Sequence, residues 1–99
     1  MNAPSLMKIK QVRLAPHHHA SLTKHTRSDG RGGTVDFPQF VELVIAGYPG
    51  EQSSYLFHIC GDGEAADTWH ETQEDALYQA EWEFGVKPEE WTVPVAEPF

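Results

Sequence analysis

Alternating apolar and polar residues along the chain predict a small antiparallel sheet. Residues 6–14 have the apolar content and length of a strand, although the alternation slips near Val12, as it does at a bulge or an edge. Residues 40–46 and 54–60 predict two more strands, and 65–70 a short strand that follows the tight turn Gly61-Asp62-Gly63. A meander of three or four strands is therefore expected.

The pattern changes to a helical period after these strands. Thr72 is a good N-cap residue, and Gly85 is a natural C′ residue with a proline shortly beyond it. A helix over residues 73–84 follows. Because successive helical residues rotate by about 100°, one apolar stripe forms, made of Ala76, Leu77, Ala80 and Phe84. This stripe predicts an α+β fold in which the helix packs on one face of the sheet.

One face of each long strand is expected to pack against this helix. On residues 40–46 this face carries Val41, Leu43 and Ile45. On residues 54–60 it would carry Tyr55, Phe57 and Ile59, leaving Leu56, His58 and Cys60 on the other face.

The opposite side of the helix carries an aromatic pair among carboxylates. Tyr78 and Trp82 lie four residues apart, so they are neighbours on the helix surface. The acidic residues expected around them are Glu74, Asp75, Glu81 and Glu83. Large aromatics are typical anchors of protein interfaces, and the carboxylates would attract a basic partner. Two alternatives remain open: the tail with Trp91, Val93 and Phe99 covers the rings, or two copies of the chain pair through this face.

Charge is distributed unevenly along the 99 residues, which together form one small domain. Residues 1–34 hold six Lys or Arg and one Asp, a net charge of +5, whereas residues 35–99 hold one Lys and fourteen acids, −13. The basic arm could lie on the acidic body or bind an external partner. We expect residues 1–5 to be disordered, 16–34 to form a long loop and 92–99 an extended tail.

Two histidine groups are candidates for metal binding. His17, His18, His19 and His25 lie in the predicted loop, where consecutive histidines can bind metal adventitiously. His58, Cys60 and His70 could supply three ligands, as an alternative to a packed histidine and a packed cysteine. We expect no cofactor, and the residues favour the packed interpretation.

Other chemistry finds little support in the sequence. Cys60 beside a histidine could form a nucleophilic pair, but no signature surrounds it. Carboxylate pairs are what an acidic surface produces by chance, and the glycines of residues 30–33 lack a phosphate-loop pattern. Nucleic-acid binding through the basic arm is opposed by the acidic remainder. The single cysteine and the lack of a secretory or membrane-spanning segment predict a cytoplasmic protein.

Residues 67–86 carry the one sequence resemblance, through Asp-Thr-Trp-His at 67–70 and Glu-Phe-Gly-Val at 83–86. The segment resembles parts of small uncharacterised bacterial proteins, which imply no activity. In size, acidity and expected shape the chain is also similar to bacterial toxin-neutralising immunity proteins. The sequence therefore favours a non-catalytic protein-binding module. A small metal protein or metal-dependent enzyme using His58, Cys60 and His70 is the alternative, and nucleic-acid binding a weaker one.

Overall fold

The computed structural model describes residues 5–18, 26–28, 30–36 and 40–94. The predicted disorder at 1–5 and the predicted tail at 92–99 lie mostly outside these residues. The elements that the described residues form are β1 (Met7–Arg13), β2 (Thr26–Ser28), β3 (Thr34–Asp36), β4 (Phe40–Gly47), β5 (Ser54–Cys60), β6 (Ala65–His70), α1 (Gln73–Phe84) and the 3-10 helix η1 (Pro88–Glu90).

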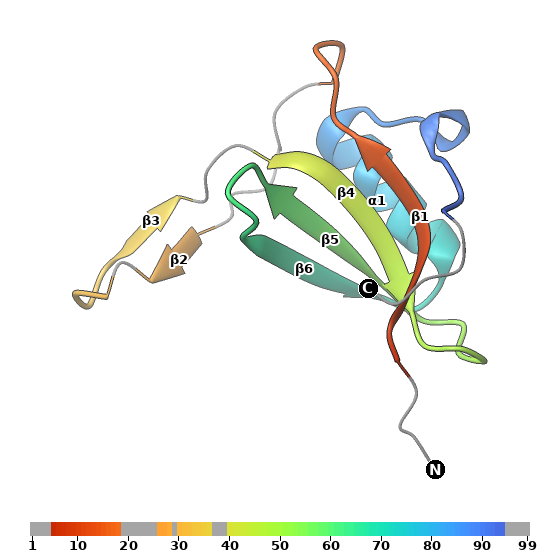
Figure 1. The fold of residues 1–99 in the computed structure, drawn as a ribbon, viewed down its shortest axis with the longest axis horizontal. Coiled ribbons are helices and arrows are strands. Elements are labelled where there is room, and N and C mark those ends of the chain that lie inside the picture. Colours follow the sequence, from red (N-terminus) through yellow and green to blue (C-terminus); the bar gives the residue numbers. More distant parts are fainter. Residues whose placement is uncertain (1–4, 19–25, 29, 37–39, 95–99) are drawn as a thin grey trace.

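The predicted α+β fold is confirmed. Among the described residues, β1, β4, β5 and β6 form an antiparallel four-stranded sheet in the order β1-β4-β5-β6, and α1 covers one of its faces (Figure 1). The pairing register is uniform along β5 and β6, where Leu56 lies opposite Thr68. It shifts between Lys8 and Lys10 in β1, so the predicted slip near Val12 belongs a few residues earlier. No helix among the described residues is long and apolar enough to cross a membrane.

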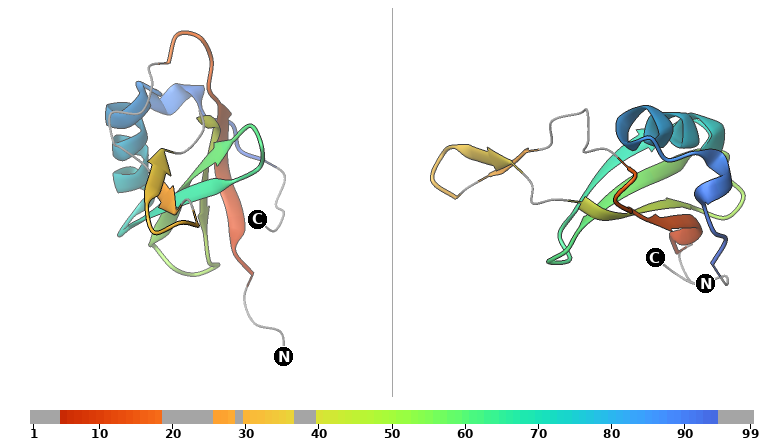
Figure 2. Two further views of the ribbon diagram at one scale, coloured as in Figure 1. Left: turned by 90° about the vertical axis from the view of Figure 1, so that its left-hand side faces the viewer. Right: turned by 90° about the horizontal axis from the view of Figure 1, so that it is seen from above.

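The segment predicted as a long loop contains a second element of structure. β2 and β3 pair as an antiparallel hairpin, from Thr26 opposite Asp36 to Ser28 opposite Thr34. Gly30 and Gly32 have φ angles of 80° and 84°, a region that glycine enters without steric cost, and this allows the chain to reverse. Figure 2 shows the hairpin apart from the four-stranded sheet.

The core lies between α1 and the sheet. Helix residues Ala76, Ala80 and Phe84 are buried, and α1 packs against β5 and β6. The sheet and C-terminal residues of the same cluster are Val12, Phe40, Leu43, Ile45, Leu56, Cys60, Val86 and Trp91. Phe40 reaches this face because the pairing of β4 with β5 shifts between Phe40 and Glu42.

The predicted face of β5 is wrong. Ser54, Leu56, His58 and Cys60 are buried, whereas Tyr55, Phe57 and Ile59 are half-buried. The buried side can hold a histidine because α1 supplies a partner for it, as described below.

The predicted ends of α1 are confirmed. The Thr72 hydroxyl accepts a hydrogen bond from the Asp75 backbone N–H at 3.1 Å. Gly85 has a φ of 76°, and its N–H donates to the carbonyl of Glu81 at 2.8 Å. These caps fix where the helix begins and ends, and therefore which residues occupy each of its faces.

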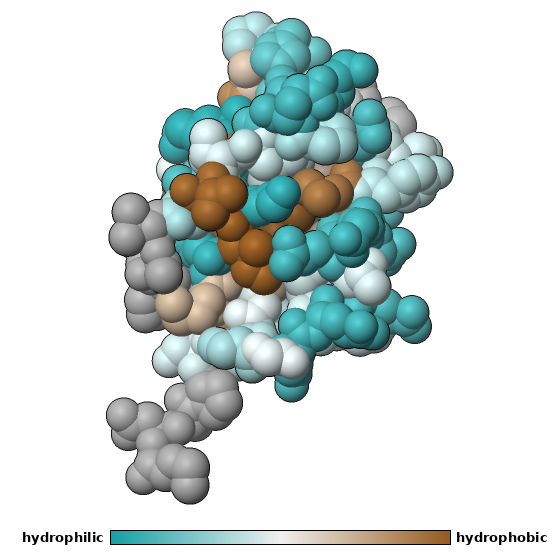
Figure 3. Space-filling model, turned by 90° about the vertical axis from the view of Figure 1, so that its right-hand side faces the viewer, coloured by the Kyte–Doolittle hydropathy of each residue, from teal (hydrophilic) through white to brown (hydrophobic). Residues whose placement is uncertain are grey.

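The chain after α1 returns to the edge of β1. Trp91 is buried in the core, and Thr92 forms an isolated bridge with Gln11 through N–H···O bonds of 2.9 Å in both directions. Figure 3 shows this side of the molecule, where hydrophobic residues form a patch surrounded by hydrophilic ones.

Candidate protein-binding face

The outer side of α1 presents two aromatic rings to solvent. The exposed fractions are 69% for Tyr78 and 50% for Trp82, and their spacing places them one turn apart. Within the described residues no segment covers them, because Trp91 is buried in the core and Val93 is exposed elsewhere at 76%. Phe99 lies outside the described residues. We refer to Tyr78, Trp82 and the exposed acidic residues Glu74, Asp75 and Glu81 as the outer face of α1.

Glu83 does not belong to this outer face, so its predicted position is wrong. Its side chain is 1% exposed and its Oε1 lies 2.8 Å from Nε2 of His58 on β5. Seven residues separate Glu83 from Ala76, which is close to two helical turns and places both on the buried stripe. The helical spacing alone places Glu83 on the buried stripe, but the charge of its side chain suggested an exposed position.

The buried pair of His58 and Glu83 is a structural link between β5 and α1. Nδ1 of His58 lies 3.4 Å from the carbonyl oxygen of Ala66, so this nitrogen carries a proton and donates. Nε2 faces the carboxyl group of Glu83 across a hydrogen bond of 2.8 Å. The imidazole also contacts the rings of Phe40 and Phe84. With both side chains at most 1% exposed, the pair has no access to a substrate in solution.

Asp75 connects the outer face to the sheet. Its Oδ2 lies 2.9 Å from Nδ1 of His70, the last residue of β6, while the side chain remains 60% exposed. Nε2 of His70 is 2.7 Å from the hydroxyl of Thr68. Both ring nitrogens of His70 are therefore engaged, and Asp75 can still meet a partner.

The structure does not bring His58, Cys60 and His70 together, which contradicts the predicted metal set. In the β5–β6 ladder His58 lies opposite Ala66 and His70 opposite Ser54. Four residues of strand separate the two positions, roughly 13 Å at 3.3 Å per residue. Cys60 lies beyond His58, farther still from His70, and is buried. This burial also argues against the cysteine as a nucleophile.

A different group, His17, His18 and Glu90, has ligand atoms within 4.8 Å of one another. The hydrogen bonds oppose metal binding there. Nδ1 of His18 accepts from the Ala15 N–H at 2.9 Å, so its Nε2 carries the proton and donates to Glu90 Oε1 at 2.9 Å. In metal sites the second histidine nitrogen is normally a donor. His19 and His25 lie outside the described residues. The group is a clasp between the segment after β1 and η1.

The clasp predicts that the protein loses part of its stability in acid. The pKa of Glu90 is lowered from its ordinary 4.5 to about 2, first by the Lys87 backbone N–H and then by the His17 side chain. Because the folded value is depressed, the contribution of Glu90 to stability is complete above pH 4.5 and is lost as the pH falls toward 2. A carboxyl NMR titration should give a Glu90 midpoint near 2.

The His17→Ala variant should raise this midpoint while leaving it below 4.5, since the Lys87 N–H remains. An ordinary midpoint in the parent protein would show that the clasp does not form in solution.

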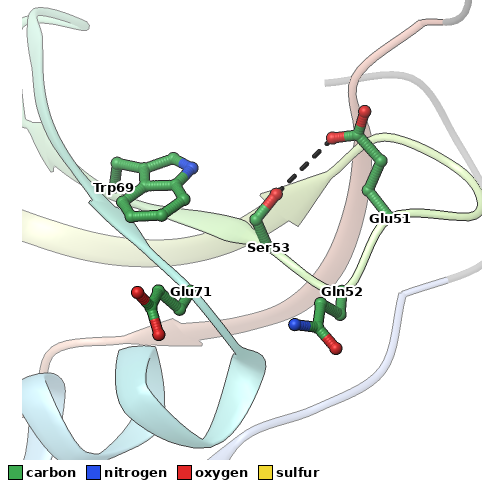
Figure 4. A pocket seen from close by; sticks show the side chains of 5 residues that line it. All are labelled: Glu51, Gln52, Ser53, Trp69 and Glu71. Carbon is green, nitrogen blue, oxygen red and sulfur yellow. Dashed lines mark hydrogen bonds between the residues drawn. The ribbon is translucent and has the colours of Figure 1, made fainter.

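Trp69 on β6 is a further exposed ring, which was not identified from the sequence. It is 56% exposed, on the sheet face away from α1. Trp69 borders an open hollow of about 520 Å³ beside the β4–β5 turn (Figure 4). The hollow is lined by Glu51, Gln52, Ser53, Trp69 and Glu71. Strand alternation could have placed this ring, because neighbouring residues of a strand point to opposite faces of the sheet and His70 faces the helix.

Comparisons with protein-family models, with curated proteins and with solved structures found no match to this chain.

Proposed function

We propose that the chain is a non-catalytic module that binds another protein through the outer face of α1. The observation that carries this proposal is the exposure of Tyr78 and Trp82, at 69% and 50%, side by side on a capped helix. Aromatic rings of this kind hold large apolar area with few rotatable bonds, so little conformational entropy is lost when a partner covers them. Their solvent exposure leaves that area available for binding.

The charges around the rings favour a partner with a basic surface. Glu74, Asp75 and Glu81 are exposed on the same helix, and residues 35–99 together carry a net charge of −13. A complementary partner has a basic surface, toward which long-range attraction would accelerate association. An acidic inhibitor or immunity-type protein that covers a basic site on its target fits this description.

The proposal is tested by comparing two double variants of the protein. Tyr78→Ala/Trp82→Ala removes both anchors, and Tyr48→Ala/Val93→Ala removes two exposed apolar residues outside the face. A protein captured from cells of the source organism by the parent and the control, but not by Tyr78→Ala/Trp82→Ala, would be purified and titrated by calorimetry. We expect the anchor variant to bind at least roughly thirtyfold more weakly, and the affinity of the parent to fall with added salt.

Thermal unfolding of both variants should stay close to that of the parent, because the replaced side chains are exposed. Equal loss of binding in both double variants would contradict the proposal. So would sedimentation data showing that the chain alone dimerises through Trp82, since the face would then be occupied by a second copy.

A further inference from the structure

Among the described residues, the outer edge of β6 has no hydrogen-bonded strand beside it. The Cys60 N–H donates to the Glu64 carbonyl at 2.7 Å, just before β6 begins. Inward and outward backbone groups alternate along an antiparallel strand. Ala66, Thr68 and His70 therefore direct their backbone groups toward β5, and Ala65, Asp67 and Trp69 direct theirs away from the sheet.

The two edges of the sheet differ in how they are protected. The edge at β1 has an irregular register, and Thr92 pairs with its residue Gln11. At β6, the described part of the chain supplies no further strand. An open edge of this kind is a template for an added strand unless charged side chains or a cover block it.

The side chains near this edge favour a basic segment. Trp69 and Asp67 are exposed on the side of the sheet away from α1. The hollow is lined by Trp69 and Glu71 on one side and by Glu51 on the other, where the Glu51 carboxylate accepts a hydrogen bond from the Ser53 hydroxyl at 3.5 Å (Figure 4). A lysine or arginine side chain in the hollow could stack on the indole ring and meet the Glu71 carboxylate.

We propose that an extended basic segment of the partner adds to β6 as a fifth strand of the sheet and places a Lys or Arg side chain in the Trp69 hollow. This inference rests on the proposed function and names the part of the partner that binds. Because α1 packs on β5 and β6, with Asp75 in contact with His70, one partner can reach this edge and the outer face of α1 together.

A second copy of the chain is a poorer occupant. The outward residues of β6 are centred on Asp67, so a symmetric antiparallel pair of β6 strands would place two Asp67 carboxylates opposite each other. Like charges in directly opposed positions destabilise a sheet. Asp67 therefore disfavours self-association while it attracts a basic strand.

The test uses a peptide of alternating valine and lysine, seven residues long, added to the full chain at millimolar concentration. Amide hydrogen exchange is followed by NMR. We expect exchange at Ala65, Asp67 and Trp69 to slow about tenfold on saturation, with little change at the inward amides of Ala66 and Thr68. The same peptide with N-methyl groups on the amides that pair with β6 should not bind.

Two matched variants separate the backbone from the charge. Asp67→Pro and Asp67→Ala both lose the carboxylate, but only the proline variant loses the outward N–H, at an edge position that tolerates proline. We expect Asp67→Pro to bind the lysine peptide about tenfold more weakly than Asp67→Ala. If Asp67→Pro does not fold, the N-methylated peptide still decides the question.

Three outcomes would overturn the inference. One is an unchanged exchange rate at the three outward amides, another is equal binding by the N-methylated peptide, and the third is slowing that depends on protein concentration without peptide. None of them affects the thirtyfold test on Tyr78 and Trp82, so this inference can fail while the proposed function stands.

Discussion

Replacing Glu83 with alanine should lower the free energy of unfolding by about 3–5 kcal/mol, the cost of breaking a buried pair by removing one partner. Glu83 and His58 are each 0% exposed, and the imidazole would lose the carboxyl group that lies 2.8 Å from its Nε2. Refilling the site with water is opposed by the surrounding rings of Phe40 and Phe84. Urea denaturation monitored by far-UV circular dichroism measures the change.

The double variant His58→Leu/Glu83→Met is the matched control. It removes both polar partners and keeps apolar volume in their place, so we expect it to be close to the parent in stability or above it. A double variant as unstable as Glu83→Ala would show that the pair contributes more than a hydrophobic replacement can. A stable Glu83→Ala variant would contradict the burial of this carboxyl group.

Phe84→Ala should also destabilise the protein by about 3–5 kcal/mol, because it leaves a cavity in the core. Phe84 is 1% exposed at the end of α1. Its ring centroid lies 6.1 Å from that of Phe40 in an edge-on arrangement and 5.7 Å from that of His58. Alanine would remove these contacts, and the capped helix could close the cavity only in part. The free energy of unfolding from urea denaturation reports the loss.

Tyr78→Ala provides the comparison on the same helix. It also replaces an aromatic residue by alanine, but at a position that is 69% exposed, so we expect a change within about 0.5 kcal/mol. Equal losses of stability in Phe84→Ala and Tyr78→Ala would contradict the description of one side of α1 as buried and the other as exposed.

The elements that the sequence predicts well are those with local signals. Thr72 and Gly85 mark the ends of α1 through hydrogen bonds that involve only nearby residues, so the helix could be predicted within its observed bounds. The meander followed in the same way from turn signals such as Gly61-Asp62-Gly63 and from the period of two. The β2–β3 hairpin was missed because its strands are only three residues long.

The errors concern contacts between residues far apart in sequence. His58 and Glu83 lie 25 residues apart, and each appears suited to the surface when considered alone. Together they satisfy one another, and this reverses the predicted face of β5 and removes Glu83 from the outer face. His18 and Glu90 show the same limitation over 72 residues. Local patterns therefore predict elements, whereas partners of buried polar groups require the tertiary structure.

The buried link between His58 and Glu83 also fixes the rotation of α1 about its own axis. A helix held to the sheet only by Ala76, Ala80 and Phe84 could rotate about its own axis at small cost, since apolar contacts are not directional. The hydrogen bond at Glu83 is directional, and rotation of the helix would leave two polar groups buried without a hydrogen-bond partner. Trp82 is its immediate neighbour, so the direction in which the indole projects is set from inside the molecule. Substitutions on the solvent side can then alter what the helix displays without altering where it is displayed.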